Sequence, residues 1–599
     1  MFSFAYPLLR YVSKYLLILW TFVLLAACQP SPSVQRSVFP LPEGVEIVES
    51  EPGRYGGILV VAGASEPRTF NALVAEDAYS SGAIGMMFSG LVDYDPIWQK
   101  HVPALAQAWE RSEDGLSYTF YLRRGVRWSD GAPFTADDVI FSFDAIFDER
   151  YPNRYSQQYT IGGKPLVYEK VDEFTVRFTS AEVYAPFIND LGFATILPRH
   201  ILQKAFKEGT LQKQWSSKTA IDSPAAIVGT GAFRLHSYRP GERIVYEPNP
   251  HYWKSDRLGQ RLPYIDFFVS KFVPDSHAQV LLFATGQTDV IGQIDGSDLA
   301  WVRRTQDTYN FRIIEQGPAS GIQFIWFNQK PGVNEKNEPY VAPHALKWFQ
   351  DKRFRHAIAH GLDREGLVNA LYGGLGQPLH SIISPANHKW HNPNTVRYGY
   401  HPDRSRELLS AMGFEVGADG IMVDPQGHRL SFELIISQGR SRTEQIATTF
   451  VENMKALGME VKLTYLDFGN LIAKTSATFD YEAALIGFTG GNDPSGGKAI
   501  YRSDGRLHLW NPQQAEPATD WEAAVDALMD AQQRTLDEEQ RIALIHQMQD
   551  IFSEELPLIF LITPTVYTGI KEHWQNVNPP PSGSLLWNVE ALWTNSVKP

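Results

Sequence analysis

The chain has 599 residues, which suggests about three to five domain-sized units, and 43% apolar with 20% charged residues is typical of a globular protein. The formal charge of −13 argues against a general nucleic-acid binder, which needs a basic surface to neutralise phosphates. The single cysteine excludes an intramolecular disulfide and a cysteine zinc cluster.

The N-terminus carries the pattern of an export signal. Arg10 and Lys14 precede an apolar run that ends in Leu-Ala-Ala directly before Cys28. The run is shorter than the roughly 20 residues that a membrane-spanning helix needs, and its flanks match a signal peptide. The Leu-Ala-Ala-Cys segment resembles a bacterial lipobox, so we expect residues 1–27 to be a signal peptide, Cys28 to be acylated and residues 28–49 to form a tether. The alternative is a signal peptide that happens to contain a cysteine.

The first half of the chain predicts mainly strands. Residues 58–62 follow a Gly-Gly turn, and the alternating segments 117–123 and 175–178 are typical of half-buried strands. Thr135 with the acids after it predicts the start of a helix that carries apolar residues up to Ile146.

The second half predicts alternating strands and helices. A helix is expected from Asp351 to Leu371. A strand at 430–436, a helix at 443–457 closed by Gly458, and a strand at 459–465 follow it. The same order recurs around 481–487 and 521–554, which indicates an α/β fold.

Several spaced motifs carry a family resemblance. Two turn dipeptides, Asp114-Gly115 and Asp130-Gly131, lie within the pattern. The pattern comprises Pro103-Ala-Leu-Ala106, Trp109-Glu110, Tyr118-Thr-Phe120, Leu122-Arg123, Gly125-Val-Arg-Trp128, Thr135-Ala-Asp-Asp-Val139 and Phe141-Ser142, with later parts at 229–253, 327–328, 353–364 and Pro557. It resembles family 5 extracellular solute-binding proteins, the dipeptide- and oligopeptide-binding components of bacterial ATP-binding-cassette (ABC) importers.

The resemblance implies a two-lobed periplasmic-binding-protein fold of type II, in the large peptide-binding class, with a hinge and an inserted domain. Domain I would combine residues 50–89, 213–318 and 562–599, with domain II at 90–212 and domain III at 319–561. The lobes would close on a peptide-like solute and present it to a permease with ATPase subunits. The implied protein is an exported, lipid-anchored monomer facing the periplasm or the cell exterior, with no catalysis, cofactor, metal or nucleic acid.

The ligand contacts implied by the resemblance lie in two segments. One is Glu76, Asp77 and Ala78, where relatives place an acid before the first helix of domain I; helix capping is the alternative for Glu76. The other is Gly487, Phe488, Thr489, Gly490, Gly491, Asn492 and Asp493. The acid that pairs with a peptide ammonium in relatives falls at Gly490 and is missing, so either Asp493 replaces it or the cargo lacks a free amino terminus in that pocket. The glycines would let a ligand approach the backbone amides.

Other chemistries have little support. Residues 491–498 lack the spacing and the hydroxyl residue of a phosphate loop, and no Gly-x-Ser-x-Gly elbow occurs. His356 and His360 are spaced to share a helix face and form a two-ligand metal site, with no third ligand evident. A binder of a sugar, an opine or a nickel chelate, and a secreted hydrolase using two distant carboxylates, remain the alternatives.

Overall fold

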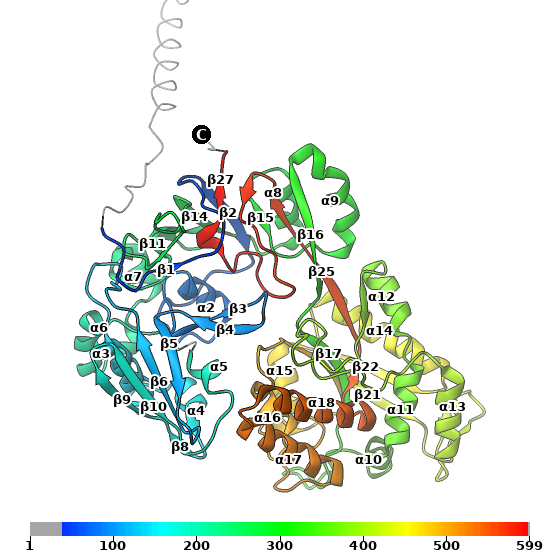
Figure 1. Ribbon diagram of the computed structural model, residues 1–599. Helices are drawn as coiled ribbons and strands as arrows, with labels where there is room; N and C mark the ends of the chain where they lie inside the picture. Colours follow the sequence, from blue (N-terminus) through cyan, green and yellow to red (C-terminus); the bar gives the residue numbers. More distant parts are fainter. Residues whose placement is uncertain (1–38, 193, 597–599) are drawn as a thin grey trace, which may run out of the picture.

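The computed structural model describes residues 39–192 and 194–596, and these form two lobes (Figure 1). The larger hydrophobic core joins residues from Leu59 to Val290 with C-terminal residues such as Trp574 and Leu592. A second core is built from residues between Ile322 and Ile562. The signal-peptide, Cys28 and early tether expectations lie outside the described residues.

The first lobe contains an eight-stranded sheet assembled from distant parts of the chain. Its strands, in spatial order, are β11 (Phe233–Arg239), β12 (Arg243–Pro248), β14 (Phe267–Phe272), β2 (Ile58–Gly63), β15 (Val290–Ile291), β25 (Ile562–Lys571) and β16 (Phe311–Pro318), with β18 (Gly376–Pro378) also paired to β25. β2 pairs in parallel with β14 and β15, whereas β25 pairs antiparallel with β15 and β16. The C-terminal segment therefore completes a sheet begun near the N-terminus. The strand expected at 58–62 is confirmed.

A smaller antiparallel sheet lies in the same lobe. Its strands are β5 (Ala106–Arg111), β6 (Ser117–Leu122), β10 (Thr175–Thr179) and β9 (Val167–Asp172). The helix α3 (Ala136–Phe147) begins where the sequence predicted, because Thr135 and Asp138 form a reciprocal capping box. Its apolar face, including Val139 and Phe143, is fully buried.

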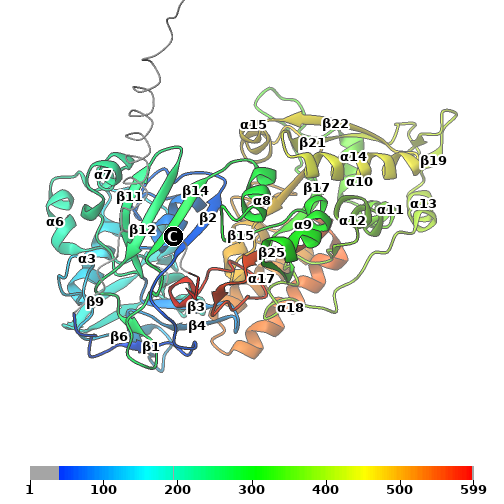
Figure 2. The same ribbon diagram turned by 90° about the horizontal axis from the view of Figure 1, so that it is seen from above.

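The remaining helices of the first lobe include some on its outer side and some on the side toward the second lobe (Figure 2). They are α2 (Ala78–Gly85), α4 (Tyr155–Gln158), α5 (Phe187–Gly192), α6 (Arg199–Lys207), α7 (Ser217–Asp222), α8 (Ser276–Ala284) and α9 (Gly296–Tyr309). A short hairpin of β3 (Val92–Asp95) and β4 (Lys100–Pro103) projects beside α2.

The second lobe is an α/β layer structure. Its five-stranded sheet has the order β22 (Glu460–Leu466), β21 (Ser431–Ser437), β23 (Ala483–Phe488), β17 (Ile322–Phe327) and β24 (Ile559–Phe560). Its helices are α10 (Pro343–Gln350), α11 (Lys352–Gly361), α12 (Arg364–Tyr372), α13 (Pro402–Ala411), α14 (Ser441–Ala456), α15 (Phe468–Ala473), α16 (Lys498–Tyr501), α17 (Asp520–Arg534) and α18 (Glu538–Glu555). The predicted strand–helix–strand order through β21, α14 and β22 is confirmed.

The single helix predicted from Asp351 to Leu371 is wrong. Two helices, α11 and α12, occupy this segment, and Leu362 between them has an extended backbone. Asp363 caps α12 by accepting from the Gly366 amide, and the buried Arg364 donates to the carbonyls of Ala359 and Phe560. The cap and this tertiary contact favour a break that the continuous apolar period does not reveal.

Two chain segments cross between the lobes, from β16 to β17 and from β24 to β25 (Figure 1). The lobes also contact each other directly away from these crossings. The contacts include Ala185 N to Gln533 O (2.6 Å), Arg534 to Glu182 (3.1 Å) and Gln99 Nε2 to Ala386 O (3.0 Å). The strands of the eight-stranded sheet come from all three segments assigned to domain I, except β18; the domain boundaries themselves stay a prediction.

Across the described part of the chain, no helix combines the length and the apolar character needed to cross a membrane.

Candidate ligand-binding site

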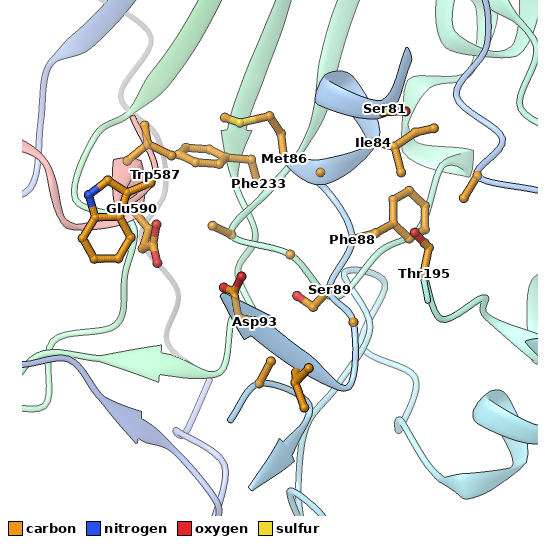
Figure 3. A pocket seen from close by; sticks show the side chains of 18 of the residues that line it. Ser81, Ile84, Met86, Phe88, Ser89, Asp93, Thr195, Phe233, Trp587 and Glu590 are labelled. Atoms are coloured by element: carbon orange, nitrogen blue, oxygen red, sulfur yellow. The ribbon is translucent and has the colours of Figure 1, made fainter. Parts of the chain in front are cut away.

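A cavity of about 590 Å³ opens in the first lobe. Its volume lies in the range of about 300–1,000 Å³ that is usual for small-molecule sites. The cavity is lined by α2 and the chain after it, by β3, by α4, by residues 231–233 and 252–254, and by the C-terminal residues 586–590. Figure 3 shows Glu590 and Thr195 on opposite sides of it, with Asp93 between them.

The position of α2 is fixed by a cap at its N-terminus. Asp77 accepts from the amides of Tyr79 (3.0 Å) and Ser80 (2.8 Å), and the Ser80 hydroxyl donates to its other oxygen (2.6 Å). Although burial raises the pKa of Asp77, these hydrogen bonds lower it overall. The helix then presents Ser81 and Ile84 to the cavity. Asp77 therefore fills the helix-capping role that the sequence analysis considered for Glu76.

Glu76 and Ala78 are exposed at this helix start and do not line the cavity. Their predicted contact with a ligand stays a prediction.

An ion network closes one side of the cavity. Lys254 lies 3.6 Å from Glu46 and 3.5 Å from Glu590, and Arg123 lies 2.5 Å from Glu46. The side chains of Lys254 and Arg123 are only 12% and 8% exposed, so the two carboxylates balance two buried cations. The charges of these four side chains therefore sum to zero.

Asp190, at the opposite wall, is a carboxyl with a raised pKa. Burial is the main cause that raises the pKa to about 6; the nearby Asp493 adds to the rise, and hydrogen bonds from Tyr184 and Asn189 oppose it. The folded state therefore binds this proton more tightly than the unfolded chain does.

We expect Asp190 to make stability pH-dependent. Because the folded pKa is raised, the stabilising contribution is present below about pH 4 and is lost as the pH rises through about 6. Asp190→Asn should raise the free energy of unfolding at pH 7.5 by ~1–3 kcal/mol and flatten its change between pH 4 and 7. Urea unfolding at several pH values measures this; an unchanged pH profile would contradict it.

The second predicted contact segment lies in the other lobe. Gly487 and Phe488 end β23, and residues 489–492 form an exposed turn after it. Asn387 donates to the Gly491 carbonyl (3.0 Å) and the Trp390 indole donates to the Asn492 carbonyl (3.0 Å). The turn is thus held by its carbonyl groups.

The missing acid at position 490 has a steric cause. A Cβ atom built on Gly490 would lie 2.3 Å from the Ser320 carbonyl oxygen, closer than such atoms approach. No acidic side chain fits there while the backbone keeps this path.

Asp493 does not have a free carboxylate for a ligand ammonium. Arg541 donates to both of its oxygens (2.6 and 2.8 Å), and the two side chains are only 7% and 8% exposed. Burial raises the pKa of Asp493, but Arg541 lowers it overall. Asp493 already has an internal cation, which favours the second alternative, a cargo without a free amino terminus in that pocket; a ligand contact of Asp493 stays a prediction.

The structure does not bring the two predicted segments into contact. Residues 76–78 belong to the first lobe, and residues 487–493 belong to the second. Which of the remaining residues touch a ligand stays a prediction.

The histidine pair on α11 is engaged by the backbone. His356 Nε2 donates to the Glu554 carbonyl (2.6 Å), and His360 Nδ1 donates to the Gly399 carbonyl (3.1 Å). Within residues 39–192 and 194–596, no group of three or more His, Cys, Asp or Glu side chains is placed to hold a metal ion.

The sequence analysis missed the cavity. Its charged lining residues are Asp93, Arg154, Asp190, Lys254 and Glu590, and they come from segments far apart in the chain. No local spacing links these residues, so only the fold reveals that they share a site.

Comparisons with known proteins place this chain and its two-lobed fold in the class of solute-binding proteins. The family model described as "Bacterial extracellular solute-binding proteins, family 5 Middle" matches residues 100–505. The chain belongs to this family, whose members are extracellular or periplasmic binding proteins rather than enzymes. The resemblance seen in the sequence is thereby confirmed.

Individual relatives cover nearly the whole chain. A Deinococcus radiodurans protein named "Probable ABC transporter-binding protein" is 27% identical over 552 residues, covering 88% of this chain and 91% of that protein. The "Oligopeptide-binding protein AppA" of Bacillus subtilis is 25% identical over 547 residues, covering 90% and 92%.

Solved structures share the fold. AppA from Bacillus subtilis in complex with a nonapeptide has a TM-score of 0.68 at 24% identity, covering 91% of this chain and 100% of that one. The substrate-binding protein CtaP from Listeria monocytogenes has a TM-score of 0.74 at 23% identity, with coverage of 91% and 100%. The two-lobed α/β fold class predicted from the sequence is confirmed.

Proposed function

We propose that this chain captures a peptide-like solute between its lobes and delivers it to the permease of an ABC importer. Partner subunits hydrolyse the ATP, and the chain itself performs no catalysis and uses no cofactor. Family membership and relatives named as oligopeptide- and dipeptide-binding proteins support this function. The observation that carries it is the 590 Å³ cavity in the first of two connected lobes, which has the size of a small-solute site.

Lobe closure is the mechanism that this architecture supports. Two chain crossings connect the lobes, so a hinge movement there changes the distance between the lobes without unfolding either core. A solute that contacts both lobes favours the closed state because it binds that state more tightly.

The chain is further proposed to act as an exported monomer that is attached to the membrane through an acylated Cys28. The signal-like residues 1–27 and the Leu-Ala-Ala-Cys segment support this attachment. The tether predicted at 28–49 is shorter than expected, because Glu46 and Ile47 pair with Lys254 and Ser255 of the first lobe. The residues between Cys28 and this strand would then let the lobes meet a membrane-embedded permease.

Pools of random di- to hexapeptides test the function. At a hundredfold excess over the dissociation constant, a bound peptide should stabilise the protein by about 2.7 kcal/mol and raise its melting temperature. Small-angle scattering should show a smaller radius of gyration at the same time. Parallel pools of oligosaccharides, opines and nickel–histidine complexes serve as controls. If one of these raises the melting temperature and the peptides do not, a non-peptide solute replaces the proposed cargo.

A further inference from the structure

Most charged groups in the first-lobe cavity are already neutralised. Lys254 and Glu590 belong to the balanced network with Glu46 and Arg123. The Asp190 carboxyl accepts hydrogen bonds from Tyr184 and Asn189. A ligand that paired with any of these would have to break an existing interaction first.

Asp93 is different. It lies on β3 at the cavity, its side chain is exposed, and its one hydrogen bond comes from the neighbouring Tyr94 amide (2.8 Å). In the described part of the chain no Lys, Arg or His side chain lies at ion-pair distance from it, although, against the lowering effect of burial, its charge and those of Glu590 and Glu46 raise the pKa of Lys254. Figure 3 shows its carboxyl group directed into the cavity.

Arg154 supplies the opposite charge. It directly precedes α4 and lines the same cavity. Its guanidinium lies 4.9 Å from the Tyr155 ring centroid and donates to the Tyr155 hydroxyl (3.2 Å), and no carboxylate of the described residues forms an ion pair with it. Stacking on Tyr155 orients a planar donor that is suited to a carboxylate.

The second lobe cannot offer an equivalent acid. Gly490 has no room for a side chain, and Asp493 is paired with Arg541. Among the described residues, Asp93 in the first lobe is therefore the one carboxylate of the cavity that has neither an ion partner nor a side-chain hydrogen bond.

We infer that Asp93 binds the ammonium group and Arg154 the carboxylate of a short zwitterionic peptide whose two ends enter the first-lobe cavity and which the second lobe covers on closure. This inference rests on the proposed function, because it assigns the charge recognition of that cargo. Charge-assisted hydrogen bonds of this kind are typically worth a factor of ~10–100 in affinity.

Blocked peptides test both assignments. A random tripeptide pool is titrated by calorimetry in three forms: free, N-acetylated and C-amidated. Each block should weaken binding to the parent protein ~10–100-fold. Asp93→Asn should weaken binding of the free pool to the same extent and remove the effect of acetylation, while the effect of amidation stays. Arg154→Gln should also weaken binding of the free pool, and it should remove the effect of amidation while the effect of acetylation stays.

Two control variants match these changes. Glu113→Gln removes an exposed carboxylate in the same lobe that does not line the cavity, and Arg150→Gln removes an exposed guanidinium paired with Asp148. Both should behave like the parent.

The outcomes separate the inference from the function. If the parent binds none of the three pools, the proposed function fails and the inference falls with it. If the parent binds the pools but blocking has no effect, or if Asp93→Asn and Arg154→Gln keep their sensitivity to the matching block, the inference alone is overturned. Loss of the acetylation effect in Glu76→Gln would place the ammonium before α2 and would also overturn it.

Discussion

Asp493→Asn should lower the free energy of unfolding by about 3–5 kcal/mol, the usual cost of removing one partner of a buried ion pair. Arg541 would keep its hydrogen bonds to Gln532 and Ser495 but would be left as an uncompensated charge that is only 8% exposed. Urea unfolding followed by tryptophan fluorescence measures the loss. Since the variant destabilises the second lobe, weaker ligand binding by it would not show that Asp493 meets the ligand.

A double variant distinguishes loss of charge balance from loss of the cap. Asp493 also accepts from the Ser495 amide (2.9 Å), and asparagine can preserve this bond. Asp493→Asn combined with Arg541→Met removes both charges, so it should recover most of the lost stability. Asp530→Asn is the matched control: Asp530 pairs with Arg502 but is 43% exposed, and its loss should cost less than about 1 kcal/mol. If Asp493→Asn and Asp530→Asn lowered the free energy of unfolding equally, burial would not be what makes the Asp493–Arg541 pair important.

Local structure could be predicted where one short-range interaction dominates. The start of α3 follows from the Thr135 capping box, and the end of α14 follows from Gly458, whose φ of +81° suits glycine. The break between α11 and α12 could not be predicted, because it depends on contacts of Arg364 with Phe560, nearly 200 residues away.

The candidate site, too, could be predicted only where a local pattern of residues decides its structure. The sequence identified the missing acid at position 490, but only the Ser320 carbonyl explains why glycine is required there. It identified Asp493 as a nearby carboxylate, but its partner Arg541 lies on another helix. The cavity lining depends on chain segments from residue 72 to residue 590, which no motif connects.

Removing the proposed lipid anchor at Cys28 should produce the largest change in where the protein is found. Cys28→Ser should move the protein from the detergent-rich phase to the aqueous phase in a phase-partition experiment, because serine lacks the thiol that would be acylated. One acyl chain holds a protein only marginally to a membrane, whereas several chains give lasting attachment. The loss should therefore be nearly complete. The mass of the N-terminal peptide should show residues 1–27 removed and acyl chains on Cys28 in the parent protein.

A high-salt wash is the control for this experiment, since salt screens electrostatic attachment of exposed charges and leaves acyl chains in place. The parent should stay with the membrane after the wash, and Cys28→Ser should not. If the variant still fractionates with washed membranes, something other than the Cys28 acyl groups attaches the chain. If the parent itself is released with an unmodified Cys28, the segment is an export signal that contains a cysteine by chance. Capture of the solute between the lobes would stand in either case, because the cavity lies far along the chain from this residue and belongs to the folded lobes.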